Sequence, residues 1–167
     1  MLDPEFDDHK EDIQSSVKRF EKMLNEEENS FFDLDTLEQI AEHYFIQGKF
    51  DEGLKACNIG LEHFPYTLEL ITLKAQILGE MQKAEQGIEL IENAMLLFPT
   101  DLDLLMVKGS LLSQINQHEQ AVQIFLHLLE HAEEKDDIYY REHAPELRTS
   151  TYITDSICYS ACALAHQ

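Results

Sequence analysis

Apolar residues recur along the chain with a helical spacing, and the pattern itself returns every 34 residues. Pro65 and Pro99 each follow a phenylalanine and lie 34 residues apart (99 − 65). In each repeat, a small residue follows an apolar one by four positions, and a large apolar residue comes three positions later. This spacing places all three side chains on one face of a helix. The residues are Leu37, Ala41 and Tyr44, then Ile71, Ala75 and Leu78, then Leu105, Gly109 and Leu112.

A second helix in each repeat carries its own pair of a small residue and an apolar residue four positions on. The pairs are Gly53 and Cys57, Gly87 and Ile91, and Ala121 and Phe125. A polar turn such as Gln47–Phe50 separates the two helices, and proline ends the pair because it lacks the amide proton of a continuing helix. The pattern predicts six repeat helices at about 35–47, 51–64, 68–81, 84–98, 102–115 and 118–134.

A seventh helix is predicted before the repeats, at about residues 9–26. Ile13, Val17, Phe20 and Leu24 form one apolar stripe, and Asp7–Asp8 can cap the helix start. A terminal repeat exposes the face on which a further unit would stack, so we expect this helix to cap the array. The alternative is a free docking helix that contributes nothing to stability.

The C-terminal segment 136–167 departs from the repeat. His143-Ala144-Pro145 interrupts the helix expected there, whereas Ile157, Ala161 and Leu164 again show the apolar–small–apolar spacing. Two interpretations remain open. The segment is either a divergent native cap or the truncated or altered end of a longer array.

A 34-residue helix–turn–helix unit with these small and large positions resembles the tetratricopeptide repeat (TPR) family over about residues 34–135. The resemblance implies an all-α fold, a right-handed solenoid of antiparallel helix pairs, with three repeats at 34–67, 68–101 and 102–135. The N-terminal segment 1–30 would supply the capping helix. Lys74 and Lys108 occupy a position that is usually leucine in the family. We expect their methylenes to pack on the core and their ammonium groups to reach water.

Charge narrows the possible partners. The chain carries 33 acidic and 12 basic side chains, a net charge of −21, which disfavours nucleic acid and anionic membranes and attracts basic proteins or peptides. No apolar run approaches the roughly 20 residues that span a bilayer. The chain start lacks the basic and apolar regions of a secretory signal, so we expect a cytoplasmic location.

No motif indicates catalysis, a cofactor or a metal. Asp33–Asp35 and Asp101–Asp103 stand where helices begin and are interpreted as caps, because the glycine and distal glutamate of a calcium loop are missing. Cys158 and Cys162 lie one helical turn apart and are interpreted as packing residues. Cys57 occupies a core position and should be buried and inert. We therefore expect no enzyme activity, no cofactor and no metal ion.

In the TPR family the first helices of successive repeats line a concave groove, so the resemblance implies a protein-interaction scaffold. Helical geometry assigns the groove to the face beside the core stripe, with Asp35, Glu69 and Asp103 at one rim. The candidate groove residues are Glu38, Glu42, Phe45, Thr72, Gln76, Met106, Ser110 and Ser113. We expect a protein or peptide partner, basic or extended. The alternative is a structural segment of a longer solenoid, or a self-association module, with no peptide ligand.

Some TPR grooves clamp the acidic C-terminal tails of heat-shock chaperones, which requires lysine, arginine and asparagine in the groove. The matching positions here are Glu38, Glu42, Thr72 and Gln76. On this basis the sequence predicts that such tails are excluded.

Overall fold

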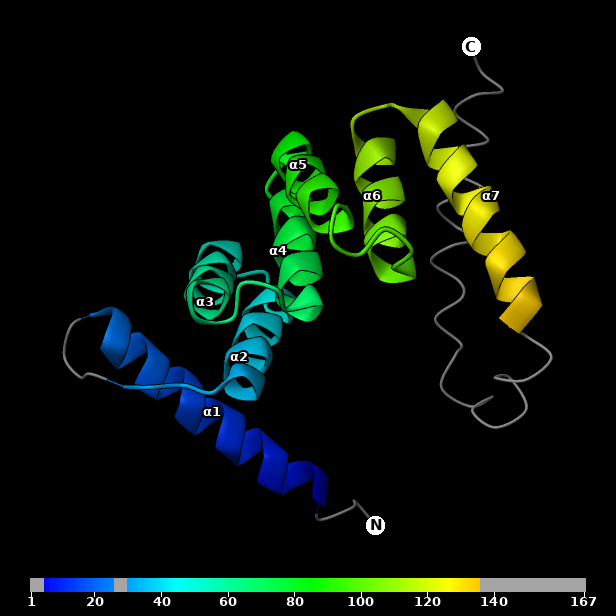
Figure 1. Cartoon of the computed structure of the whole chain (residues 1–167). Helices are drawn as coiled ribbons and strands as arrows, with labels where there is room; N and C mark the ends of the chain where they lie inside the picture. Colours follow the sequence, from blue (N-terminus) through cyan, green and yellow to red (C-terminus); the bar gives the residue numbers. More distant parts are fainter. Residues whose placement is uncertain (1–4, 26–29, 136–167) are drawn as a thin grey trace. The chain divides into compact units, whose positions relative to one another are not determined.

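The computed structural model describes residues 5–25 and 30–135, and every regular element in these ranges is a helix (Figure 1). The helices are α1 (Glu5–Leu24), α2 (Leu34–Ile46), α3 (Phe50–His63), α4 (Leu68–Glu80), α5 (Ala84–Met95), α6 (Leu102–Gln114) and α7 (His118–Lys135). The six predicted repeat helices are confirmed; the largest error is at α5, which ends at Met95 rather than at 98. The chain divides into two units, Met1–Ile77 and Leu78–Gln167, with the boundary inside α4.

Aspartate caps begin two of the repeat helices, as predicted. The Asp33 carboxylate accepts a hydrogen bond from the Thr36 amide at 2.8 Å, at the start of α2. Asp101 accepts one from the Leu104 amide at 2.9 Å, at the start of α6. Each bond satisfies an amide that has no partner within its own helix.

The turn inside each helix pair has the same geometry three times. Gly48, Gln82 and Asn116, which are 34 positions apart, have φ values of +70°, +60° and +62°. The next amide in each turn donates back to the helix, as from Lys49 to the Tyr44 carbonyl at 2.9 Å. This left-handed C-terminal cap satisfies helix carbonyls and reverses the chain. Glycine marks it in the sequence only at position 48.

In the first unit, α2 packs on α3, and the first part of α4 packs on α3 in turn. Leu37, Ala41 and Tyr44 are fully buried, which confirms the predicted stripe. A Cβ atom at Gly60 would lie 2.5 Å from Leu70 Cδ1, too close for ordinary contact. The absence of a side chain at this position therefore lets α3 and α4 approach closely.

Helix α1 packs on α2 in the first unit (Figure 1), as the cap interpretation expects. Phe20 is fully buried, and its ring centroid lies 5.8 Å from that of Phe32 and 6.3 Å from that of Tyr44. Leu24 is only half-buried, so Phe20 is the main anchor of the stripe. The Asp7–Asp8 cap is wrong, because α1 already begins at Glu5.

The second unit has its core between α5, α6 and α7. Phe125 is the largest residue of this core, with 1% of its surface exposed. Its buried neighbours are Leu112, Ala121 and Leu128. Half-buried apolar residues of α5, α6 and α7 pack around them, so the predicted core of the third repeat is confirmed. Of the three residues in the predicted stripe of α6, only Leu105 is half-buried, and the other two are buried.

The sequence expectations for the segment 136–167, including those for Cys158 and Cys162, fall outside the described residues. Within residues 5–25 and 30–135, no helix is long and apolar enough to cross a bilayer.

Candidate peptide-binding face

Three carboxylates come together on one face of the first unit. Asp35 and Glu38 lie one turn apart on α2, and Glu69 lies in the first turn of α4. Partial burial of Glu38 raises the pKa of its carboxyl above the ordinary value, and the negative charges of Glu69 and Asp35 raise it further. Like charges and desolvation both disfavour the ionised form. The sequence analysis placed Asp35 and Glu69 at the rim of a groove. In the structure, the negative charges of both residues raise the pKa of Glu38.

The adjoining turn of α2 combines an acid with apolar surface. Glu42 is exposed, and Phe45 is half-buried with its ring centroid 6.1 Å from that of Phe50. Ile46 is 76% exposed. Phe45 is thus held by a neighbour at the start of α3 while part of its surface faces solvent.

The two candidate residues on α4 in the first unit differ in their availability. The Thr72 hydroxyl lies 2.9 Å from both the Leu68 and Glu69 carbonyl oxygens and donates to the helix backbone. Its proton is therefore committed within α4, which leaves the oxygen lone pairs for a ligand. Gln76 is exposed and can both donate and accept.

The second unit carries the three remaining candidates, all half-buried on α6: Met106, Ser110 and Ser113. Met106 packs against the core around Phe125, so part of its side chain serves folding. The structure places these three on one helix. They belong to the second unit, whereas the acidic face on α2 belongs to the first, and the two units are described separately.

Two further features bear on chemistry. Burial raises the pKa of the Cys57 thiol to about 12, so the thiol stays protonated and unreactive near neutral pH. Within the described ranges, no three His, Cys, Asp or Glu side chains lie together as a metal site would require.

Sequence reasoning missed a surface pocket between α6 and α7, lined in part by Lys108. The signal that could have found it was the lysine at a position that usually holds leucine. The Lys108 ammonium lies 2.9 Å from a Glu92 carboxylate oxygen, and 21% of the lysine side chain is exposed. The Lys108 ammonium therefore bonds to a carboxylate of α5, where the sequence analysis expected it to reach water.

Comparison with solved structures shows the fold. The first TPR domain of the human RPAP3 protein matches with a TM-score of 0.62 and 20% identity, covering 80% of this chain and 93% of that one. The crystal structure of MamA matches with a TM-score of 0.59 and 13% identity, covering 99% and 97%. No protein-family model and no curated protein matches the chain by sequence. The protein is an all-α helical repeat protein with the TPR fold.

A third match corrects the sequence analysis. The first TPR of Spaghetti (RPAP3), bound to the HSP90 peptide SRMEEVD, matches with a TM-score of 0.60 and 20% identity, covering 79% of this chain and 93% of that one. That peptide is an acidic chaperone tail, so the predicted exclusion of such tails is wrong. The exclusion rested on Glu38, Glu42, Thr72 and Gln76. An exposed charge such as that of Glu42 contributes no more than about 1 kcal/mol, which is too little to exclude an acidic ligand by itself.

Proposed function

We propose that this protein is a protein-interaction module that holds an extended peptide along the first helices of its repeats. The repeats would be 34–67, 68–101 and 102–135, preceded by the capping helix. The TPR fold supports the proposal, because stacked helix pairs present extended surfaces for binding.

The observation that carries the proposal is the acidic face of the first unit. The charges of Asp35 and Glu69 act on Glu38, which is already partly desolvated. A cationic side chain placed there would relieve the repulsion and satisfy the carboxylates with charge-assisted hydrogen bonds. The ligand would therefore carry an arginine or lysine at this point.

Apolar contacts beside the acids would set the ligand's register. One side of the Phe45 ring contacts Phe50, so the exposed part of the ring can pack against an aliphatic chain or a guanidinium group of the ligand. Exposed Gln76 on α4 could bond to the ligand backbone. In the second unit, Met106, Ser110 and Ser113 are the candidate contacts that α6 would offer to a peptide.

The test is fluorescence anisotropy with three labelled peptides: a decapeptide of alternating arginine and glycine, the same peptide with glutamate for arginine, and SRMEEVD. Wild type is compared with Glu38→Gln/Glu42→Gln. Exposed charge contacts contribute up to about 1 kcal/mol each, so the double variant should bind the arginine peptide roughly tenfold more weakly at low salt. Added salt should weaken wild-type binding as well.

A matched control is Glu85→Gln/Glu89→Gln. It removes two exposed carboxylates at the same spacing from α5 and should leave affinity within about twofold, because a screened charge away from the contact contributes little. If wild type does not prefer the arginine peptide to the two acidic ones, the basic ligand is wrong. If none of the three peptides binds, the structural or self-association reading takes its place.

A further inference from the structure

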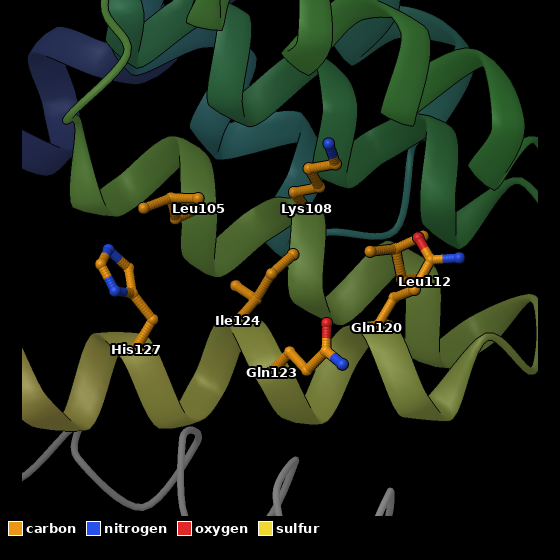
Figure 2. Close-up of a pocket in the computed structure, with 7 residues that line it drawn as sticks. All are labelled: Leu105, Lys108, Leu112, Gln120, Gln123, Ile124 and His127. Atoms are coloured by element: carbon orange, nitrogen blue, oxygen red, sulfur yellow. The ribbon is translucent and has the colours of Figure 1, made fainter.

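A surface pocket of about 270 Å³ opens between α6 and α7 in the second unit (Figure 2). It shares no residue with the proposed peptide-binding face. Its apolar lining consists of Leu105, Leu112 and Ile124. The polar lining residues are Lys108, Gln120, Gln123 and His127. The volume lies just below that of drug-sized ligand sites and suits one or two side chains.

The lining contains no carboxylate, although the whole chain has 33 acidic residues among 167. At each of these two positions one of the earlier repeats has an acid. Gln123 corresponds to Glu89 in the second repeat and to Lys55 in the first, and Gln120 corresponds to Gln86 in the second repeat and to Glu52 in the first. Only the third repeat has a neutral amide at both positions.

Lys108 contributes its side-chain stem to the lining, and its ammonium points away from α7 (Figure 2). Its ammonium is bonded to Glu92 at 2.9 Å, and the Glu92 side chain is 56% exposed. Because the Glu92 side of this ion pair is open to solvent, screening keeps the contribution of the pair modest. A ligand carboxylate could therefore take the place of Glu92 at small cost, while the lysine methylenes stay in the lining.

We propose that this pocket is a second binding site, which takes an aliphatic side chain with an adjacent carboxylate from a partner peptide. Leu105, Leu112 and Ile124 receive the aliphatic group. Lys108 bonds to the carboxylate, and the amides of Gln120 and Gln123 donate to it or to the peptide backbone. The site extends the proposed function, because its ligand has the charge opposite to that of the ligand on the α2 face.

The test titrates the whole 167-residue chain, labelled with ¹⁵N, with N-acetyl-leucine and with N-acetyl-leucinamide. The two probes share the aliphatic group and differ in the carboxylate. N-acetyl-leucine should shift the side-chain amide signals of Gln120 and Gln123, and should bind about threefold more tightly than the uncharged amide, because a single solvent-screened ion pair is modestly favourable.

Two variants at exposed positions separate the site from a general charge effect. Gln123→Glu restores the acid of the second repeat and should abolish the preference for N-acetyl-leucine, whereas Glu92→Gln frees Lys108 and should increase it. Gln39→Glu adds the same charge to an exposed position of α2 and should change nothing. The proposal is overturned if both probes bind alike to wild type, if Gln39→Glu acts as Gln123→Glu does, or if Glu92→Gln weakens N-acetyl-leucine. Each of these results leaves the test of the α2 face unaffected.

Discussion

The helix pairs α2–α3 and α6–α7 share one repeat register but distribute their side-chain volume in opposite ways. In the first pair the second helix is small along its packing stripe, and in the last pair it is large. The stripe residues are Gly53, Cys57 and Gly60 on α3, and Ala121, Phe125 and Leu128 on α7. All six are buried.

The difference is balanced by the helix on the other side of each contact. At α3, the space above the glycines is filled by Leu70 and Ile77 of α4. At α7, Phe125 itself fills the space, and its ring would lie 2.8 Å from a Cβ placed on Gly109 of α6. Because protein interiors are close-packed, a repeat can exchange large and small residues across a contact as long as the total volume is kept.

The largest expected effect contrasts the equivalent residues Phe125 and Cys57. Phe125→Ala should lower the free energy of unfolding by about 3–5 kcal/mol, because it leaves a large cavity in the second unit. Cys57→Ala removes only a thiol and should cost about 1 kcal/mol. Denaturant unfolding of both variants measures this. Equal losses would mean that the two stripes carry similar volume, which contradicts the comparison.

The sequence predicted the helices and their buried stripes because helical periodicity and the 34-residue spacing are local signals. It could not predict which side of each contact carries the volume, since Gly109 and Phe125 meet only in three dimensions. The same holds for the charge that Glu69 places on Glu38 from another helix. The α6–α7 pocket was missed because it depends on what two helices leave unfilled. Among the residues that line the pocket, the repeat pattern marks only Lys108 as unusual.

The second prediction concerns glycines on either side of these contacts. Gly109→Ala should destabilise the protein by about 1–3 kcal/mol, because the new Cβ meets the rigid ring of Phe125 at 2.8 and 2.9 Å. Gly60→Ala meets the flexible end of Leu70 at 2.5 Å, and alanine is favoured in helices by about 0.5–1 kcal/mol. Its net cost should therefore stay below about 1 kcal/mol. Thermal unfolding compares the two, and a larger loss at Gly60 would show that Leu70 cannot move.

The third prediction uses the three turns, where the first pair has glycine and the others do not. Gln82→Gly and Asn116→Gly should each stabilise the protein by up to about 1 kcal/mol, because glycine has no penalty in the left-handed region. Gln82 should gain more, because asparagine tolerates this region better than glutamine. Gly48→Ala should lose about 1 kcal/mol although no atom lies within 4 Å of the added Cβ. A stabilising Gly48→Ala would mean that the φ of +70° is not needed there.

The smallest effect is electrostatic and distinguishes the acidic face of the first unit from the rest of the surface. The folded state raises the pKa of Glu38 through burial and the charges of Glu69 and Asp35, so it binds that proton more tightly than the unfolded chain does. The stability from this proton is full below the ordinary carboxyl pKa and is lost as pH rises through the raised value. Glu38→Gln should therefore be more stable than wild type near neutral pH, by a few tenths of a kcal/mol.

The gain should shrink as pH falls through the ordinary glutamate range, about pH 4, because wild type is then protonated and resembles the variant. Melting curves of wild type and Glu38→Gln across this range measure the gain. Glu85→Gln, which changes an exposed residue of α5, is the control for removing one charge. A gain that is the same at all pH values would arise from helix propensity or packing and not from repulsion. In that case the negative charges of Asp35 and Glu69 would not destabilise the ionised form of Glu38, and the argument for a cationic ligand at this face would fail.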